Sequence, residues 1–356
     1  MASNILDNPN ARILVVGAFS QDPAVYTYAT SFYTTLQALA RGRVYSFNTR
    51  QQLLVDRLPS ALTTRLAALL INQQLLKATA TLKPTLVFII KGEQIFASTL
   101  RSIKTTGTQV INFYPDNPFV LWNGNSTVHV LESLPLLDCM PFWSPELFPA
   151  LHMAGCANTC FFPFAYDSQL LSPTASFTAQ QLAPYTSQVC FVGTWEPERE
   201  QQLVHLREQL PQLDLAIWGN LWAEKAGNGL LKKNIRGPAI YGTEMIKAFK
   251  ASKIVLNFIR QQNSGAHNMR TIEVPACGAF LLTERTLQQA QTLFTEDKMI
   301  GCFENNDELV AKIKFYLQSD QRMLYEIAKS GFIHAQNYTL ENQLRRYFTS
   351  CPHIAP

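Results

Sequence analysis

The chain has 356 residues, of which 47% are hydrophobic and 16% charged, and its formal net charge is +4. This composition excludes an intrinsically disordered chain, and the length favours two domains over one. The sequence has no Lys/Arg-rich run of the kind that marks a nucleic-acid-binding tail, so no nucleic-acid partner is expected. It also has no apolar stretch of ~18 residues and no N-terminal secretory signal, which together predict a cytoplasmic protein without a transmembrane segment.

The seven cysteines are odd in number, and most lie in apolar runs. This pattern predicts buried free thiols in a reducing compartment. The pair Cys156 and Cys160 has no second ligand pair at zinc-site spacing, so no bound metal is expected there.

Short apolar runs alternate with longer helical patterns through the first half of the chain. Helices are expected at 24–40, 60–82 and 93–105, and strands at 12–18, 44–47, 85–91, 109–114, 134–142 and 159–164. Continuous β-branched and aromatic runs separated by helices indicate parallel strands that are covered on both faces.

A segment at 167–188 is rich in Ser, Thr, Gln and Pro, which is typical of a linker or an irregular crossing. The strand–helix alternation then restarts. Strands are expected at 189–193, 213–219, 253–259, 278–283 and 299–303, and helices at 197–210, 243–250, 306–318, 320–334 and 340–349. A short segment near 268–276 is compatible with a further helix.

The two alternations predict two doubly wound α/β domains in tandem. We expect a first Rossmann-like domain at 1–170, a linker at 171–188, a second Rossmann-like domain at 189–338, and a C-terminal helix in 339–356 that crosses back to the first domain. In such sheets ligands bind beyond the carboxyl ends of the strands, so the cleft between the two domains is the expected active site.

The stretch between the strands at 253–259 and 278–283 carries a polar pattern. On a helix, Arg270 and Glu273 lie on one face, about one turn apart. A guanidinium suits a phosphate and a carboxylate suits a sugar diol, so the pattern favours a nucleotide sugar as the ligand; the alternative is a surface ion pair. The other polar residues of the stretch are Asn257, Arg260, Asn268 and Thr271.

The second half of the chain resembles the CgeB-like, or spore-maturation-type, branch of the group 1 glycosyltransferases. The segments that carry the resemblance are FVGTWEPER at 191–199, ASKIVLN at 251–257 and NMRTIEVPACG at 268–278, with weaker matches in YPDNP at 114–118, WSPE at 143–146 and FPFAYD at 162–167. The resemblance implies the GT-B fold, in which two Rossmann-like domains face each other across a cleft. The acceptor would lie on the N-terminal domain and the nucleotide sugar mainly on the C-terminal domain.

The resemblance also assigns individual residues. Glu273 matches the carboxylate that, in related enzymes, hydrogen-bonds the nucleotide ribose. Two positions depart from the family pattern. Gly265 stands where the broader group often has a glutamate, and Asn337-Tyr338-Thr339 replaces the usual His-Thr-Tyr.

Glycosyl transfer from such a donor needs a group that stabilises the departing diphosphate. Cations, backbone N–H groups, helix N-termini or a metal ion do this. The sequence has no Asp-x-Asp, so we expect a metal-independent site with no cofactor, in which Arg270 is the first candidate cation and Arg199 the second. Lys253 and Arg260 are further candidates.

The remaining candidate donor-binding residues follow or precede expected strands and helices. Gly193 and Thr194 form a turn after a strand, Trp218 ends another strand where it could flank the nucleobase, and Tyr241 precedes a helix that faces the base. An ordinary turn and a core tryptophan are the alternatives. Asn257, Asn268 and Thr271 complete the expected donor site.

An inverting enzyme would also need a base, and Asp22 and Asp116 are the candidates in the first domain. The predicted function is transfer of a sugar, expected to be a hexose, from a UDP- or GDP-sugar to a glycan, a lipid-linked glycan or a protein, with retaining and inverting stereochemistry both open. A non-catalytic nucleotide-sugar-binding or scaffold protein, and a sugar-nucleotide epimerase on the same fold, are the alternatives.

Overall fold

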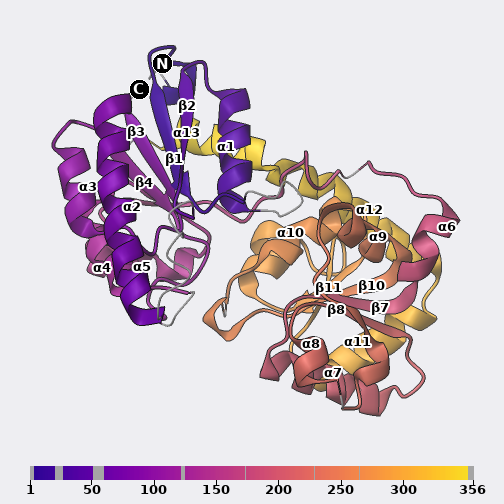
Figure 1. Cartoon of the computed structure of the whole chain (residues 1–356). Helices are drawn as coiled ribbons and strands as arrows, with labels where there is room; N and C mark the ends of the chain where they lie inside the picture. Colours follow the sequence, from indigo (N-terminus) through magenta and orange to yellow (C-terminus); the bar gives the residue numbers. More distant parts are fainter. Residues whose placement is uncertain are drawn as a thin grey trace. The chain divides into compact units, whose positions relative to one another are not determined.

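The computed structural model describes residues 4–20, 27–50, 60–121, 125–172, 174–227, 229–263 and 265–351, and for residues 60–64 and 262 it describes the backbone alone. The chain divides into two compact units (Figure 1). The first unit comprises Met1–Pro163 with Leu340–Pro356, and the second comprises Phe164–Thr339. The segment 171–188, for which we expected a linker, belongs to the second unit.

The first unit is built on a parallel sheet in the order β2-β1-β3-β4. Leu86–Ile90 reads LVFII and is buried throughout, as expected of a parallel strand that is covered on both faces. The short parallel pair β5-β6 joins β4 through a bridge between Ile111 and Cys139. The strands are β1 (Arg12–Gly17), β2 (Arg43–Asn48), β3 (Leu86–Ile90), β4 (Gln109–Phe113), β5 (Met140–Phe142) and β6 (Thr159–Phe161).

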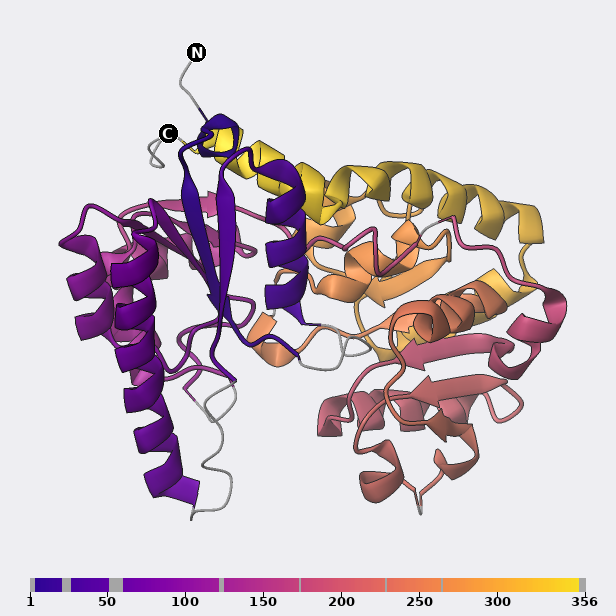
Figure 2. The same ribbon diagram turned by 45° about the horizontal axis from the view of Figure 1, so that its top comes forward.

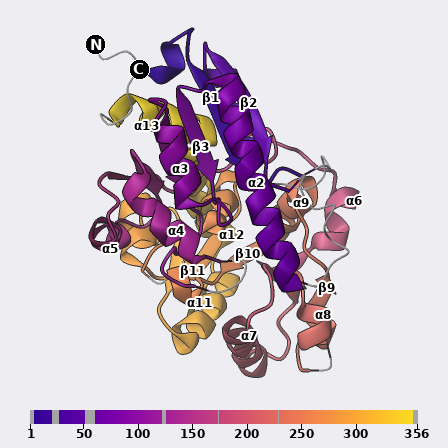
Figure 3. The same cartoon turned by 60° about the vertical axis from the view of Figure 1, so that its left-hand side comes forward.

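Helices cover this sheet. The Phe32 ring of the first helix, α1, lies 5.4 Å from the Phe88 ring of β3, and the Phe348 ring of the C-terminal helix, α13, lies 6.2 Å from it. These contacts bring α1 and α13 side by side (Figure 2). Two further helices, α2 and α3, lie side by side (Figure 3). The helices are α1 (Tyr28–Leu39), α2 (Ser60–Leu82), α3 (Ala97–Lys104), α4 (Val128–Ser133), α5 (Phe148–Met153) and α13 (Leu340–Ser350).

The second unit has a parallel sheet in the order β12-β11-β10-β7-β8-β9. The chain runs outward from β7 to β9 on one side and then returns to build β10 to β12 on the other. The strand order therefore reverses between β7 and β10, which is the point where doubly wound sheets bind ligands. The strands are β7 (Ser187–Val192), β8 (Leu215–Trp218), β9 (Ile235–Gly237), β10 (Ser252–Asn257), β11 (Leu281–Glu284) and β12 (Gly301–Phe303).

Alternate strand residues of this sheet feed two hydrophobic cores. Cys190 of β7 packs with Phe249 and Ile272, whereas the next residue, Phe191, packs with Leu206 and Ile313. These contacts place α9 and α10 on one face and α7 and α11 on the other (Figure 1). The helices are α6 (Ala179–Leu182), α7 (Pro197–Gln209), α8 (Trp222–Lys225), α9 (Gly242–Ala251), α10 (Met269–Ala276), a π-helix (Gln288–Leu293), α11 (Asn306–Gln318) and α12 (Gln321–Ala335).

One expected strand differs from the structure. Only Met140–Phe142 of the expected strand 134–142 is extended, and Leu134–Leu136 forms a 3₁₀ turn instead. Pro135 explains the difference, because its ring fixes φ and it has no N–H to donate to a sheet. In the part of the chain that the structure describes, no helix has both the length and the hydropathy that a membrane crossing requires.

Candidate functional site

The carboxyl edge of the second sheet is closely packed where the strand order reverses. The turn after β7 is held by two hydrogen bonds: Gly193 N donates to Trp218 O at 2.9 Å, and Trp222 Nε1 donates to Gly193 O at 2.8 Å. A Cβ atom on Gly219 would lie 1.9 Å from Gly193 O. The turns after β7 and β8 therefore meet backbone to backbone, which only a glycine permits at position 219.

Arg270 and Glu273 lie together at this edge. Asn268 caps the start of α10, so the first turn of that helix stands just beyond the end of β10. Arg270 Nε donates to Val192 O, the last carbonyl of β7, at 3.2 Å, and Arg270 Nη1 bonds the Glu273 carboxylate one turn along the helix. Their side chains are 22% and 9% exposed, so the pair is largely withdrawn from water but still accessible.

A second cationic group lies at the start of α7, which follows β7. Arg199 Nη1 donates to Thr194 O at 2.8 Å, and Arg199 Nε lies 3.4 Å from the Glu196 carboxylate. Arg260, beyond the end of β10, contacts the other oxygen of Glu196 at 2.5 Å. Burial lowers the pKa of Arg199; Glu196 and Glu284 oppose this shift, while Arg260 and Arg270 add to it. Three guanidinium groups thus act within electrostatic range of one another.

Three of the predicted donor-binding residues form a buried network beneath this surface. Asn268 Nδ2 donates to Asn257 Oδ1 at 2.9 Å, Asn257 Nδ2 donates to Thr283 Oγ1 at 3.0 Å, and Thr271 Oγ1 donates to Gln289 Oε1 at 2.6 Å. Asn257 and Thr271 are buried. Because these polar groups are already paired with one another, Asn257, Asn268 and Thr271 position the start of α10.

Trp218 and Tyr241 differ in exposure. The Trp218 ring lies 5.5 Å from the Tyr185 ring, and its Nε1 is buried with no hydrogen-bond partner among the described residues. Tyr241 occupies the N-cap position of α9 and is 53% exposed. Trp218 ends β8 and Tyr241 precedes α9, so both residues lie at the carboxyl edge, while the Trp218 ring packs against the core on the α9 face.

The candidate bases belong to the first unit. Asp22 lies outside the described residues. The Asp116 carboxylate is 3.1 Å from Lys91 Nζ in a partly buried ion pair. One cation expected in the second unit is placed elsewhere: Lys253 is the second residue of β10, so it lies at the amino edge of the sheet and not beside Arg270.

The structure adds acidic residues that the sequence interpretation missed. Glu196 bridges Arg199 and Arg260, as described above, and Glu284 ends β11. The Glu284 carboxylate accepts from Ile259 N at 2.6 Å and from Gln202 Nε2 at 2.7 Å. Their positions at a helix start and at a strand end were the available sequence signal, because both places meet the carboxyl edge of a parallel sheet.

The loop before α10 explains the Gly265 departure. Gly265 has φ +85°, a conformation that strains a residue with a side chain, so this backbone disfavours a glutamate at the position. Two residues later, the buried His267 accepts at Nε2 from Phe164 N at 3.0 Å, and its Nδ1 hydrogen-bonds Gln288. This imidazole ties the loop to the first residues of the second unit.

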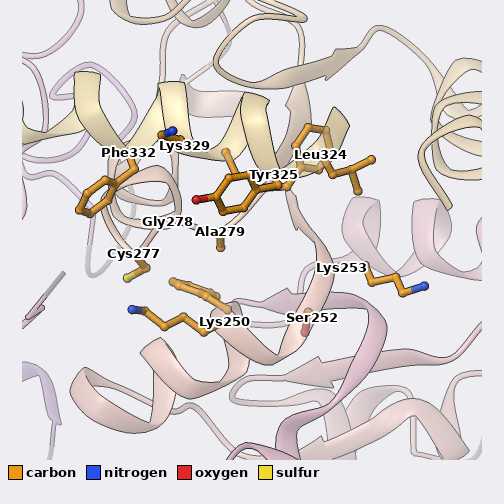
Figure 4. Close-up of a pocket in the computed structure, with 13 residues that line it drawn as sticks. Lys250, Ser252, Lys253, Cys277, Gly278, Ala279, Leu324, Tyr325, Lys329 and Phe332 are labelled. Atoms are coloured by element: carbon orange, nitrogen blue, oxygen red, sulfur yellow. The ribbon is translucent and has the colours of Figure 1, made fainter. Parts of the chain in front are cut away.

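A cavity of about 490 Å³ lies at the opposite, amino edge of the same sheet, between the ends of α9 and α10 and the side of α12 (Figure 4). Its cations are Lys250, Lys253 and Lys329. Lys250 Nζ donates to Ala175 O at 2.8 Å, and lysines near helix C-termini also complement the helix dipoles. Of the candidate donor-site residues, Lys253 lines this cavity and the others do not, so we assign the functional site to the carboxyl edge, where the strand order reverses.

Comparisons with known proteins agree with this architecture. Residues 199–349 match a family model described as glycosyl transferase-like. No protein of curated function matches the chain in sequence. A solved structure of a sucrose-phosphate synthase from Thermosynechococcus elongatus is similar, with 14% identity and a TM-score of 0.70 over 94% of this chain and 97% of the other. Anabaena HepE in complex with UDP-glucose has 13% identity and a TM-score of 0.65 over 95% of this chain and 99% of the other. The trehalose-6-phosphate synthase OtsA has 14% identity and a TM-score of 0.67 over 95% of this chain and 98% of the other.

The chain has the GT-B fold. At these identities the likeness establishes the fold and not the substrate. The α/β fold class expected from the sequence, with parallel doubly wound sheets, is thereby confirmed. In this GT-B chain the carboxyl edge of the second sheet holds Arg270, Glu273, Arg199 and Arg260 together.

Proposed function

We propose that this GT-B protein is a glycosyltransferase of the CgeB-like kind that transfers a hexose from a nucleotide-diphospho-sugar without a bound metal. The observation that carries the proposal is the Arg270–Glu273 pair at the reversal of strand order, where Arg270 also bonds the end of β7. The glycosyl transferase-like family match over residues 199–349 supports the same reaction class.

The pair offers two different recognition groups to a donor. The guanidinium has five N–H groups, and in the described part of the chain two of them donate, to Val192 O and to Glu273. The donor diphosphate would take further N–H groups of Arg270. Glu273, which only accepts when ionised, would then accept from the two ribose hydroxyls.

The other cations would act on the leaving group. When the bond from the sugar to the diphosphate breaks, negative charge develops on the terminal phosphate oxygens. Arg199 and Arg260 share Glu196, so that one carboxylate faces two guanidinium groups. Glu284 also acts on Arg199, so a diphosphate that enters beside these groups would compete with carboxylates for the guanidinium N–H groups. Such contacts stabilise the transition state most where water is excluded.

A UDP-sugar is the favoured donor, because the structure of Anabaena HepE is described as a complex with UDP-glucose; a GDP-sugar is the second choice. A glycan, a lipid-linked glycan or a protein would be the acceptor, in the cytoplasm. Asp116, and Asp22 outside the described residues, remain the proposed bases if the reaction inverts the anomeric centre.

The decisive experiment measures binding of UDP-, GDP-, ADP-, CMP- and dTDP-sugars to the wild type by thermal shift, followed by calorimetry with the best ligand. Arg270→Ala should weaken that ligand by about ten- to a hundredfold, because hydrogen bonds to charged groups contribute about 1.5–3 kcal/mol. Glu273→Ala should weaken the nucleotide sugar but should weaken inorganic diphosphate much less.

The matched control is Arg236→Ala. Arg236 is also paired with a carboxylate of the second unit, Asp214 at 3.1 Å, but this pair lies away from α10. Its substitution should leave nucleotide binding unchanged. Equal binding by the wild type, Arg270→Ala and Glu273→Ala would refute the site, and binding without hydrolysis or transfer of the sugar would instead favour a non-catalytic protein.

A further inference from the structure

Three cysteine thiols meet in the first unit, far from α10 in the sequence. The Sγ atoms of Cys139, Cys160 and Cys351 all lie within 4.8 Å of one another, and the Cys139 and Cys351 sulfurs are 3.3 Å apart. Each of the seven cysteines is in the thiol form, outside any disulfide. In the part of the chain that the structure describes, these three residues form a group of side chains that could hold a metal ion.

The three residues come from separate elements whose positions are fixed by backbone contacts. Cys139 immediately precedes β5 and bridges Ile111 of β4. Cys160 is the middle residue of β6, where it lies opposite Pro141 in the parallel register. Cys351 follows α13, and its N–H donates to Tyr347 O at 2.9 Å. The sulfurs therefore converge because the fold brings together two short strands and the C-terminal helix.

The spacing suits a metal ion bound by sulfur. A Zn–S bond of about 2.3 Å places sulfurs at tetrahedral angles about 3.8 Å apart. The Cys139 and Cys351 sulfurs are 3.3 Å apart, and all three sulfurs lie within 4.8 Å of one another, so the observed separations are close to that value. Side-chain shifts of less than an ångström, on the order of those that accompany ligand binding, would bring the three sulfurs to equal distances from one ion.

The surroundings of the thiols are also suited to soft-ion binding. Cys139 and Cys351 are buried and Cys160 is partly exposed, which gives an ion a route from solvent. The Tyr347 hydroxyl is buried beside the cluster, with the Cys139 thiol within hydrogen-bonding reach. A metal-bound thiolate would accept from this hydroxyl more strongly than a thiol does.

We propose that Cys139, Cys160 and Cys351 form a binding site for a thiophilic d¹⁰ cation, Zn²⁺ or Cu⁺. Sulfur ligands select these ions over Mg²⁺ or Ca²⁺, which prefer oxygen. Binding would release the thiol protons to solvent and leave three thiolates on the ion. For Zn²⁺ a water molecule on the exposed side of Cys160 would supply the fourth ligand, whereas Cu⁺ needs only the three sulfurs.

The site would act as a cross-link between distant parts of the chain. Cys139 and Cys351 are 212 positions apart, so an ion bound by both would close a long loop and hold the C-terminal helix on the first sheet. The expected role is structural, and it is separate from the carboxyl edge of the second sheet. Loss of the metal should loosen α13 without removing Arg270 or Glu273 from their places.

The test uses the full-length protein, reduced and handled without oxygen. Zn²⁺, Cd²⁺ as its spectroscopic substitute, and Cu⁺ held by a competing chelator are titrated separately. We expect uptake of one ion per chain, sulfur-to-metal charge-transfer absorbance for Cd²⁺ or Cu⁺, and a higher melting temperature of the loaded protein. Comparing the Zn²⁺ and Cu⁺ titrations against the chelator decides which ion is preferred.

Two variants and a matched control complete the test. Cys351→Ala and Cys160→Ala should each lower the affinity for the ion at least tenfold and remove the shift in melting temperature, with circular dichroism used to check that each variant is folded. Cys156→Ser changes a buried thiol of the same unit that is not in the cluster, and it should bind the ion like the wild type. Failure of the folded wild type to take up either ion, or uptake by Cys351→Ala equal to that of the wild type, would overturn the proposal.

Discussion

The Arg270 guanidinium is held from two directions before any ligand binds. Its Nε bonds the last carbonyl of β7 and its Nη1 bonds Glu273, while the ring of Phe249 lies 5.8 Å from the guanidinium carbon. A planar, forked cation can hold these contacts and still present N–H groups to a phosphate, which a lysine ammonium cannot do. The identity of the residue, and not only its charge, should therefore decide donor affinity.

Arg270→Lys tests that point. We expect the variant to bind the best nucleotide sugar about tenfold more weakly than the wild type, equivalent to about 1.4 kcal/mol, because the charge remains but the fork is lost. Calorimetric titration measures the change, and Arg236→Lys serves as a control for an arginine-to-lysine change elsewhere in the unit. Wild-type affinity in Arg270→Lys would mean that only charge matters at this position.

His267 should make the stability of the protein depend on pH. Burial lowers the pKa of the His267 imidazole from its usual 6.5 to about 4, and the hydrogen bond to Gln288 opposes the shift only in part. Because the folded pKa lies below the unfolded one, the unfolded chain binds more protons between these two values. The stability that the neutral ring contributes is therefore complete above the unfolded pKa and is lost as the pH falls toward the folded pKa.

A shift of this size corresponds to about 3 kcal/mol between the two limits. Urea unfolding of the wild type and of His267→Gln at about pH 7 and about pH 5 measures it, and the difference between the two proteins should shrink at the lower pH. His129→Gln is the control, since His129 is partly exposed beside Glu132. A difference between wild type and His267→Gln that does not change with pH would contradict this account.

At the scale of elements, α10 owes its start to one asparagine. The Asn268 side chain accepts from Thr271 N, the Thr271 hydroxyl bonds back to Asn268 N, and Asn268 Nδ2 also donates to Asn257. The Asn268 side chain therefore stabilises the start of α10 and also fixes the position of Arg270 relative to the sheet. A change at Asn268 should alter stability and ligand binding together.

Asn268→Ala should lower the free energy of unfolding by about 1–2 kcal/mol, the usual range for loss of a cap, and should also weaken nucleotide-sugar binding several-fold. The matched control is Asn305→Ala. Asn305 caps α11 by accepting from Glu308 N at 3.0 Å, but it lies outside the Arg270 site. Its loss should cost similar stability with unchanged affinity, as measured by chemical unfolding and calorimetry. If Asn268→Ala and Asn305→Ala bind the nucleotide sugar with similar affinity, the Asn268 cap does not position the donor site.

The elements that the sequence predicted well are those whose periodicity is strong. The expected helix 306–318 is Asn306–Gln318 and the expected helix 320–334 is Gln321–Ala335. Strand β9 was missed because it has only three residues, Ile235–Gly237, and no apolar run. The π-helix Gln288–Leu293 was missed because its glutamines are polar in sequence and buried in the structure, where Gln289 bonds Thr271.

The sequence named candidate polar residues of the site but not the partners of their side chains. Sequence spacing placed Arg270 and Glu273 on one helix face, but it could not tell which polar residues turn inward. Asn257 and Thr271 pair within the buried network, whereas Glu196, which was not predicted, bridges two arginines. Such choices depend on tertiary partners that a single sequence does not name.

At the scale of the whole molecule, each unit has a core of its own. The first sheet is closed by a helix from the end of the chain, since the Phe348 ring of α13 packs 6.2 Å from Phe88 and the ring of Tyr347 lies 5.9 Å from Phe162. Among the described residues, the two hydrophobic cores of the second sheet are formed by residues within 164–339. Stability of the first unit and nucleotide binding by the second should therefore respond to different substitutions.

Phe348→Ala and Phe249→Ala form the matched pair for this prediction. Both rings are buried, and each truncation should destabilise its own unit by about 3–5 kcal/mol. Phe348→Ala should leave nucleotide-sugar affinity near that of the wild type, because its neighbours belong to the first unit. Phe249→Ala should reduce affinity as well, since the ring lies beneath Arg270. Chemical unfolding followed by fluorescence and circular dichroism, with calorimetry under native conditions, measures both effects. Loss of affinity in a folded Phe348→Ala protein would show that nucleotide binding depends on the first core, and the second unit would then not be a self-sufficient donor-binding domain.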